Sequence, residues 1–284
     1  MNRDALKHHI GNVAGCLALA CLGALTALGL TACQSEPEGW SPNSNQNLYE
    51  YNLEKNSIPL NSYDYSSLES FRDYKYYLEK GEVVSQVGID VSEHQKEVNW
   101  SKVKASGISF CFLRAGYRGS TDGGLFTDST FATNLEGAKA AGLDVGVYFF
   151  SQATNAQEAQ EEAAYLASIL NGASLELPVV FDLEKGDSSS RTGNLSHEGA
   201  TEAAQAFTTE MDKAGYRTMV YLNKQAAETL FDISQLQNCS FWYAEYGVEK
   251  PSLGFNFDIW QYTENGSVYG IDGDVDLNIM FRKS

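Results

Sequence analysis

The sequence predicts an α/β fold, a TIM-like barrel of the (β/α)5(β)3 type in a single domain. Three observations support this prediction. Strand-like apolar runs alternate with helix-like segments from Gln86 onward, which is typical of βαβ units around a parallel sheet. The strand-like runs are almost continuously apolar, which indicates burial on both faces. Eight such runs favour a closed barrel, with a doubly wound open sheet as the alternative.

The elements can be assigned in order from the positions of the apolar residues. The expected strands are residues 87–91, 108–115, 143–150, 177–183, 218–222, 240–243, 257–262 and 275–280. The expected helices are residues 100–105, 129–141, 156–170, 197–214 and 224–231. Asn155 and Glu158 have the spacing of an N-terminal capping pair, and Gly142, Gly172 and Gly215 stand where helices should end.

The last three strands are joined differently from the first five. The connections between Tyr243 and Phe257 and between Tyr262 and Val275 lack helical periodicity, and they contain Pro251 and several glycines. A parallel crossover normally needs at least this length and usually contains a helix. We therefore expect five βα units followed by three strands that are joined by loops and pair partly antiparallel.

The N-terminal residues have the pattern of a secretion signal. A weakly basic start with Arg3 and Lys7 precedes an uncharged run over residues 11–32, which ends in small residues before Cys33. Residues 30–33, Leu-Thr-Ala-Cys, resemble the lipobox of bacterial lipoproteins, in which the cysteine is lipidated. We therefore expect a lipoprotein signal peptide over residues 1–32 and an extracytoplasmic, cell-surface domain that is lipid-anchored to the membrane. The alternative is a transmembrane anchor, since the run is just long enough to span a bilayer.

Residues 33–85 are expected to be a tether and a tyrosine-rich segment that precede the barrel domain, residues 86–284. Residues 34–62 are rich in Ser, Asn, Glu and Pro, which is typical of a flexible tether. Residues 66–80 could form an amphipathic helix packed on the domain or a sticky linker, and the pattern favours neither. Within the barrel, Cys111 and Cys239 lie in apolar runs, which favours buried thiols over a disulfide.

The charge of the chain restricts its partners. The formal net charge is -17, with only 20 lysines and arginines. A phosphate backbone is bound by basic patches, so nucleic-acid binding is disfavoured. A neutral or cationic polymer is compatible with this charge, although the charge could also serve solubility alone.

Acidic, polar and aromatic residues recur where the predicted strands end, which is where a barrel of this kind carries its active site. They are Asp90, Arg114, Tyr148, Asp182, Glu184, Trp242, Tyr243, Trp260, Gln261, Tyr262 and Asp276. Among them Tyr148, Trp242, Trp260 and Tyr262 can stack on sugar faces, although each alone is better explained as a core residue. As a set beside several acids, they favour a carbohydrate groove.

The sharpest motif is Pro-Val-Val-Phe-Asp-Leu-Glu at residues 178–184, an apolar strand that ends in two carboxylic acids. Strand residues two positions apart point the same way, about 6–7 Å apart along the backbone, so Asp182 and Glu184 can enter one pocket. Mutual repulsion and burial should separate their acidities, as glycoside hydrolysis requires. The motif alone could also be an exposed strand end or half of a metal site.

Two other chemistries are not supported. The run from Asp272 resembles a calcium loop, but Leu277 stands where that loop needs glycine, and Lys283 stands where it needs glutamate. A serine or cysteine hydrolase is unsupported because neither His94 nor His197 is paired with a recognisable nucleophile. His94 follows the first strand and is expected to line a groove.

The sequence resembles glycoside hydrolase family 25, the Chalaropsis-type lysozymes, in six segments that stand in the family's order between Val87 and Phe281. They are GIDVSEHQ, FLRAGY, GVYFF, PVVFDLE, FDIWQYT and GDVDLN. The resemblance implies a barrel with five helices and three additional strands. It also implies an N-acetylmuramidase that hydrolyses the β-1,4 bond from N-acetylmuramic acid to N-acetylglucosamine in peptidoglycan, without a metal or organic cofactor.

The resemblance also implies roles for individual residues. Glu184 corresponds to the general acid. Asp182 corresponds to its partner, which orients or stabilises the acetamido group of the substrate as that group attacks the anomeric carbon. The alternative mechanism is direct attack by a carboxylate nucleophile. Asp90 and Asp276 correspond to flanking acids. The alternatives are a surface lipoprotein that binds peptidoglycan without cutting it, and a hydrolase of another amino-sugar polymer such as chitin.

Overall fold

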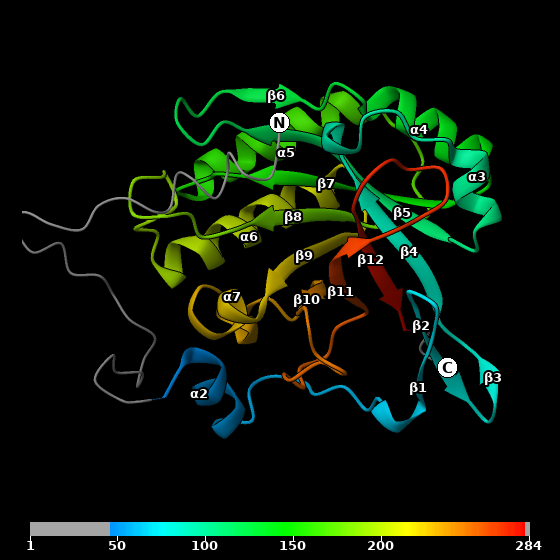
Figure 1. The fold of residues 1–284 in the computed structure, drawn as a ribbon. Coiled ribbons are helices and arrows are strands. Elements are labelled where there is room, and N and C mark those ends of the chain that lie inside the picture. Colours follow the sequence, from blue (N-terminus) through cyan, green and yellow to red (C-terminus); the bar gives the residue numbers. More distant parts are fainter. Residues whose placement is uncertain (1–45, 282–284) are drawn as a thin grey trace, which may run out of the picture. The chain divides into compact units, whose positions relative to one another are not determined.

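The computed structural model describes residues 46–281. In it, eight strands close into a barrel, and helices cover one side of the barrel (Figure 1). The barrel strands are β4 (Gln86–Val91), β5 (Phe110–Arg118), β7 (Asp144–Ser151), β8 (Val179–Leu183), β9 (Thr218–Asn223), β10 (Ser240–Ala244), β11 (Ile259–Gly266) and β12 (Val275–Met280). Neighbouring strands from β4 to β11 pair parallel. β12 closes the ring by pairing antiparallel with both β11 and β4. The predicted barrel is confirmed, and the open sheet is excluded.

Five helices follow the first five barrel strands, as predicted. They are α3 (Trp100–Ala105), α4 (Phe131–Ala140), α5 (Ala156–Leu170), α6 (His197–Lys213) and α7 (Lys224–Thr229). α5 begins after Asn155, whose side chain accepts a hydrogen bond from the Glu158 N–H at 3.0 Å, and it ends at Asn171 with φ of 46°. A short strand that was not predicted, β6 (Leu125–Thr127), pairs with the end of β5.

No helix follows β10 or β11, which confirms the prediction for the last three strands. β10 and β11 are parallel and are joined by residues 245–258, which contain neither helix nor strand. β11 and β12 form an antiparallel hairpin through residues 267–274. Among the eight barrel strands, antiparallel pairing is therefore limited to β12 and its two neighbours.

The barrel interior is filled by alternate residues of the strands. They are Phe110, Phe112, Val180, Met219, Tyr221, Trp242, Ala244 and Ile259. The rings of Phe112 and Trp242 stack with centroids 4.8 Å apart, and the Trp242 side chain is 2% exposed. Because side chains alternate along a strand, residues one position away face outward into a second apolar layer between the barrel and its cover.

On the helix-free side, residues 47–85 supply that cover. They contain α2 (Leu48–Glu54) and an antiparallel sheet of β1 (Leu68–Phe71), β2 (Tyr74–Glu79) and β3 (Glu82–Val83). Tyr63 stacks on Phe281 with ring centroids 4.2 Å apart, and its hydroxyl donates a hydrogen bond to the Phe257 carbonyl at 2.8 Å. We refer to residues 47–85 as the N-terminal layer.

The N-terminal layer corrects two predictions. The flexible tether was expected to reach residue 62, yet Leu48, Tyr49 and Ile58 are buried. Residues 68–79 form the strands β1 and β2, which are neither the amphipathic helix nor the linker that the sequence left open. Arg72 takes a positive φ between these strands, and Lys80 with Gly81 forms a two-residue hairpin turn with φ of 52° and 82°. The tyrosines are also stronger strand formers than helix formers.

The predicted signal peptide and Cys33 lie outside the described residues. Within residues 46–281, no helix is long and apolar enough to cross a bilayer. Cys111 and Cys239 are free thiols, as expected, and burial raises the pKa of the Cys111 thiol.

Candidate active site

The four predicted acids line one cavity of about 340 Å³ at the carboxyl ends of the parallel strands. Asp90 comes from β4, Asp182 and Glu184 from the end of β8, and Asp276 from the start of β12. β12 runs antiparallel, so the start of this strand lies beside the ends of the others. The barrel thus gathers acids that are far apart in sequence.

Asp182 and Glu184 point into the cavity because they continue the inward-facing series of β8 that begins with Val180. Asp182 is 7% exposed, and its Oδ1 is buried without a hydrogen-bond partner among the described residues. Burial, followed by the charge of Glu184, raises the pKa of Asp182 well above its usual range. Burial also raises the pKa of Glu184.

Asp90 and Asp276 form a second acid pair. They are direct cross-strand neighbours, and their carboxyl groups lie close enough for each to affect the pKa of the other. Asp90 Oδ2 also accepts hydrogen bonds from Gln261 Nε2 and Asn278 Nδ2, both at 2.8 Å. Burial and the neighbouring Asp90 raise the pKa of Asp276 to about 9. Burial also raises the pKa of Asp90, against the opposing effect of its amide donors.

Gln261 is held by two tyrosines that sequence analysis did not select. Its Oε1 accepts hydrogen bonds from the Tyr221 hydroxyl at 2.9 Å and from the Tyr246 hydroxyl at 2.6 Å. Both tyrosines line the cavity. Tyr221 could have been found as the inward residue at the end of the fifth barrel strand, whereas Tyr246 lies in an irregular loop that carries no periodic signal.

Asn278 is a further residue that was missed. It is fully buried on β12, two positions after Asp276 and on the same face, and its Oδ1 accepts a hydrogen bond from Trp242 Nε1 at 2.7 Å. The period of two along the last strand would have selected it as an inward polar residue. Asn278 thus connects the tryptophan at the cavity floor with Asp90.

Arg114 is at the cavity wall, as predicted, and contributes positive charge to an acidic site. Its Nε donates to Asp128 Oδ2 at 2.8 Å, and its Nη2 donates to Glu93 Oε1 at 3.0 Å. His94, which was expected in the groove, also lines the cavity, with Nε2 3.4 Å from Arg114 Nη1. These contacts fix the guanidinium group near Asp182, where its charge opposes the rise of that carboxyl's pKa.

Some of the predicted sugar-binding residues line the cavity, and others face away from it. Tyr148, Trp242 and Gln261 line the cavity with Arg114. Tyr243, Trp260 and Tyr262 do not. They alternate with Trp242 and Gln261, so they face outward and are buried under the cover of the barrel. Trp260 Nε1 donates to the Glu245 carbonyl at 3.0 Å, and the Tyr262 hydroxyl donates to the Asp73 carbonyl at 3.1 Å.

Comparisons with known proteins agree with this geometry. The model of the family described as glycosyl hydrolases family 25 matches residues 89–271. The chain is 32% identical over 203 residues to Lysozyme M1 of Streptomyces globisporus, and the match covers 67% of this chain and 66% of that protein. It is 30% identical over 191 residues to the autolytic lysozyme of Clostridium acetobutylicum, with 67% of this chain and 54% of that protein covered.

A solved structure extends the likeness to the fold. The crystal structure of the bacterial lysozyme from Streptomyces coelicolor matches with a TM-score of 0.60 and 28% identity, over 70% of this chain and 93% of that chain. The chain therefore spans between about half and two thirds of the length of the two curated relatives named above, and nearly the whole length of this solved lysozyme.

Proposed function

The chain belongs to the glycosyl hydrolases family 25, and on that premise we propose that it is a lysozyme that cleaves peptidoglycan. The bond cut is the β-1,4 bond from N-acetylmuramic acid to N-acetylglucosamine. The observation that carries this proposal is the convergence of Asp90, Asp182, Glu184 and Asp276 in one cavity. The solved lysozyme of Streptomyces coelicolor, with its comparable fold, supports the same class of activity.

In the proposed mechanism, Glu184 is the general acid. Its partly buried carboxyl holds a proton more tightly than an exposed glutamate does, and it donates that proton to the glycosidic oxygen as the bond to the anomeric carbon breaks. The departing sugar leaves with a free hydroxyl. Glu184, now ionised, then accepts a proton from the water that attacks the anomeric carbon.

Asp182 is proposed to act on the acetamido group of the substrate. Its Oδ1 has no donor among the described residues, so an amide N–H of the bound sugar can supply the missing hydrogen bond. That bond favours the charged form of Asp182, which stabilises the acetamido group while its oxygen attacks the anomeric carbon. The alternative is direct attack by a carboxylate, which gives a covalent glycosyl enzyme.

The assignment predicts that Glu184→Gln abolishes hydrolysis while the protein stays folded. Loss of a positioned general acid costs about 10²–10⁴-fold in rate. The measurement is release of muramic-acid reducing ends from purified peptidoglycan, with products identified by mass. Glu202→Gln, on the exposed face of α6, is the matched control and should retain wild-type activity. Wild-type hydrolysis by Glu184→Gln would remove this residue from the mechanism.

The same digestion separates the alternatives. A non-catalytic binder would sediment with peptidoglycan and release no sugar, and a chitin hydrolase would release shorter products from chitin than from peptidoglycan. The pH profile adds a further check. Because an acid must be protonated to act and burial raises the Glu184 pKa, activity should persist above the usual titration range of glutamate and fall as the pH rises further.

We further propose that the protein is a lipoprotein anchored to the membrane through Cys33. Support comes from the basic start, the uncharged run over residues 11–32 and the Leu-Thr-Ala-Cys sequence at residues 30–33. Labelling of expressing cells with a radioactive fatty acid should mark the wild-type protein and not the Cys33→Ser variant. A membrane-bound, unlabelled wild-type protein that still contains residues 1–32 would instead indicate a transmembrane anchor.

A further inference from the structure

Glu184 lies just beyond the strand that carries it. The ladder between β7 and β8 ends at Leu183, and the ladder between β8 and β9 ends at Asp182. No described side chain donates a hydrogen bond to the Glu184 carboxyl. The position of this carboxyl therefore depends on what holds its backbone after the sheet ends.

Thr192 provides that hold. Its side chain is fully buried, and its Oγ1 donates a hydrogen bond to the Glu184 carbonyl at 3.0 Å. The same oxygen accepts a hydrogen bond from the Gly186 N–H, also at 3.0 Å. One hydroxyl thus bridges the two peptide groups that flank Lys185. Removal of the hydroxyl leaves both groups without this partner inside the protein, which is costly.

The loop that carries Thr192 is closely packed on itself. A Cβ atom added to Gly193 would lie 2.0 Å from the Asp187 carbonyl oxygen, so only glycine allows this backbone approach. The Ser190 N–H also donates to that carbonyl at 3.0 Å. The loop therefore presents the Thr192 hydroxyl from a defined position.

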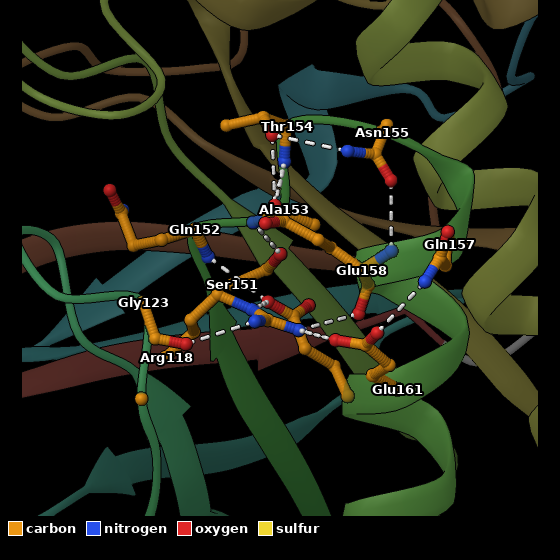
Figure 2. A network of polar contacts seen from close by, with 12 residues as sticks. Arg118, Gly123, Ser151, Gln152, Ala153, Thr154, Asn155, Gln157, Glu158 and Glu161 are labelled. Atoms are coloured by element: carbon orange, nitrogen blue, oxygen red, sulfur yellow. Dashed lines mark hydrogen bonds and ion pairs between the residues drawn. The ribbon is translucent and has the colours of Figure 1, made fainter.

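The loop is also tied to the body of the protein. Arg191 forms an ion pair with Glu158, and its Nε donates to the Gln152 carbonyl at 3.4 Å. Figure 2 shows that Glu158 and Gln152 belong to a larger polar network around Arg118. In that network, Arg118 Nε contacts the buried Glu162 Oε1 at 2.8 Å. The network connects the end of β5, the end of β7 and the first turns of α5 with the loop after the active-site acid.

We propose that Thr192 is a positioning residue that fixes the backbone of Glu184, and that Arg191 anchors the Thr192 loop for this purpose. The inference rests on the proposed role of Glu184 as general acid. Catalytic groups must be held within about 0.5 Å of their productive positions, and a carboxyl without a side-chain partner takes that precision from its main chain. Thr192 does not line the cavity, so it acts through Glu184.

The test compares Thr192→Val with Thr192→Ser. Valine keeps the shape and loses the hydroxyl, so kcat on soluble peptidoglycan fragments should fall by about 10- to 100-fold with little change in KM. Serine keeps the hydroxyl and should retain kcat within a few-fold. In Thr192→Val the alkaline limb of the pH profile should move to lower pH, because a loosened Glu184 is more hydrated and gives up its proton more readily.

The matched control is Thr208→Val, which removes a buried threonine hydroxyl that bonds to the Ala204 carbonyl inside α6. It should lower the melting temperature without moving the alkaline limb. If Thr192→Val fails to fold, Arg191→Gln tests the same loop at a less buried position, with a smaller fall in kcat and the same direction of pH shift expected.

The outcomes that contradict the inference are specific. Wild-type kcat and an unmoved alkaline limb in both Thr192→Val and Arg191→Gln would show that the loop does not position the acid. Equal losses in Thr192→Val and Thr192→Ser would show that the hydroxyl is not the group responsible. An inactive wild-type protein would instead refute the proposed function, so the two failures are distinguishable.

Discussion

The two sides of the barrel are covered by different parts of the chain. From β4 to β9, each strand is followed by a helix, and α3 to α7 cover the outside of this half. Along β10, β11 and β12 there is no such helix, and the N-terminal layer covers the outside instead (Figure 1). On both sides, apolar side chains of the strands are buried against the cover. The sequence patterns that indicate the two covers differ.

The N-terminal layer is part of the folded domain, because its residues hydrogen bond to residues of the barrel domain. Residues 59–61 lie along residues 254–256, where the Asn61 N–H donates to the Gly254 carbonyl and the Asn256 N–H donates to the Pro59 carbonyl, both at 2.9 Å. The Asn52 amide donates to Asp232 at 2.8 Å in the interior. The family match begins at residue 89, so this cover lies outside the matched region.

The largest expected effect follows from deletion of residues 46–85. The outward faces of β10 to β12 would then expose aromatic side chains that are now buried, and the cost should exceed a stability margin of about 5–15 kcal/mol. We expect insoluble or molten protein, measured by soluble yield and near-UV circular dichroism. A chain that starts at residue 46 is the control. A folded, active chain from residue 86 would show that the barrel needs no such cover.

A smaller effect compares one aromatic residue from each side. Tyr63→Ala removes the ring stacked on Phe281, and Phe207→Ala removes a buried ring 5.0 Å from Phe181 on the helix-covered side. Phe207→Ala should cost about 3–5 kcal/mol of unfolding free energy in urea denaturation. Tyr63→Ala should cost less, because the Tyr63 side chain is only partly buried. Tyr63→Phe keeps the ring and should cost only about 0.5–1.5 kcal/mol. A loss below 1 kcal/mol for Tyr63→Ala alone would mark the N-terminal layer as loosely attached.

The smallest effect concerns Asp276, the cavity-lining acid that lies on β12 of the helix-free side. Asp276 has a pKa of about 9 in the folded protein and an ordinary pKa of about 3.9 when unfolded. The folded state therefore holds a proton that the unfolded state has lost between these values, so the free energy of unfolding falls as the pH rises from about 4 to about 9. Asp276→Asn should weaken this dependence and stabilise the protein at pH 7 by roughly 0.5–2 kcal/mol.

Thermal melts of wild type and Asp276→Asn from pH 4 to pH 9 measure this prediction, and the variant should also lose hydrolytic activity. Glu202→Gln, which changes an exposed carboxyl, should follow the wild-type pH dependence. Parallel curves for wild type and Asp276→Asn would mean that the raised pKa of Asp276 does not cause the fall in unfolding free energy with pH.

The helix-covered side could be predicted from sequence because its signals are local. Helical periodicity, capping residues such as Asn155 and continuous apolar strands all act over a few neighbouring residues. The N-terminal layer could not be predicted in this way, because the burial of Tyr63 depends on Phe257 and Phe281, which are about two hundred residues away. Only the turn at Lys80 and Gly81 offered a local signal for a hairpin.

The site residues could likewise be predicted where they lie on regular strands and not where they lie in loops. The four acids were found because the ends of parallel strands share one edge of the barrel. The inward and outward residues of β10 and β11 were not separated, since the prediction named Trp242 with Tyr243 and Gln261 with Trp260 and Tyr262. Strict alternation along each strand would have corrected this. Thr192 and Tyr246 lie in loops, where sequence carries no comparable period.

Closure of the barrel has a consequence for the timing of activity. Asp90 belongs to the first barrel strand, and its partners Asn278 and Asp276 belong to the last, with a sequence separation of 188 between Asp90 and Asn278. A nascent chain in which β12 has not yet been synthesised contains Asp90, Asp182 and Glu184 and still lacks Asp276 and Asn278. The complete acid cluster, and with it the proposed hydrolytic activity, therefore forms only after the last barrel strand has been synthesised and paired, and such long-range pairing is slow.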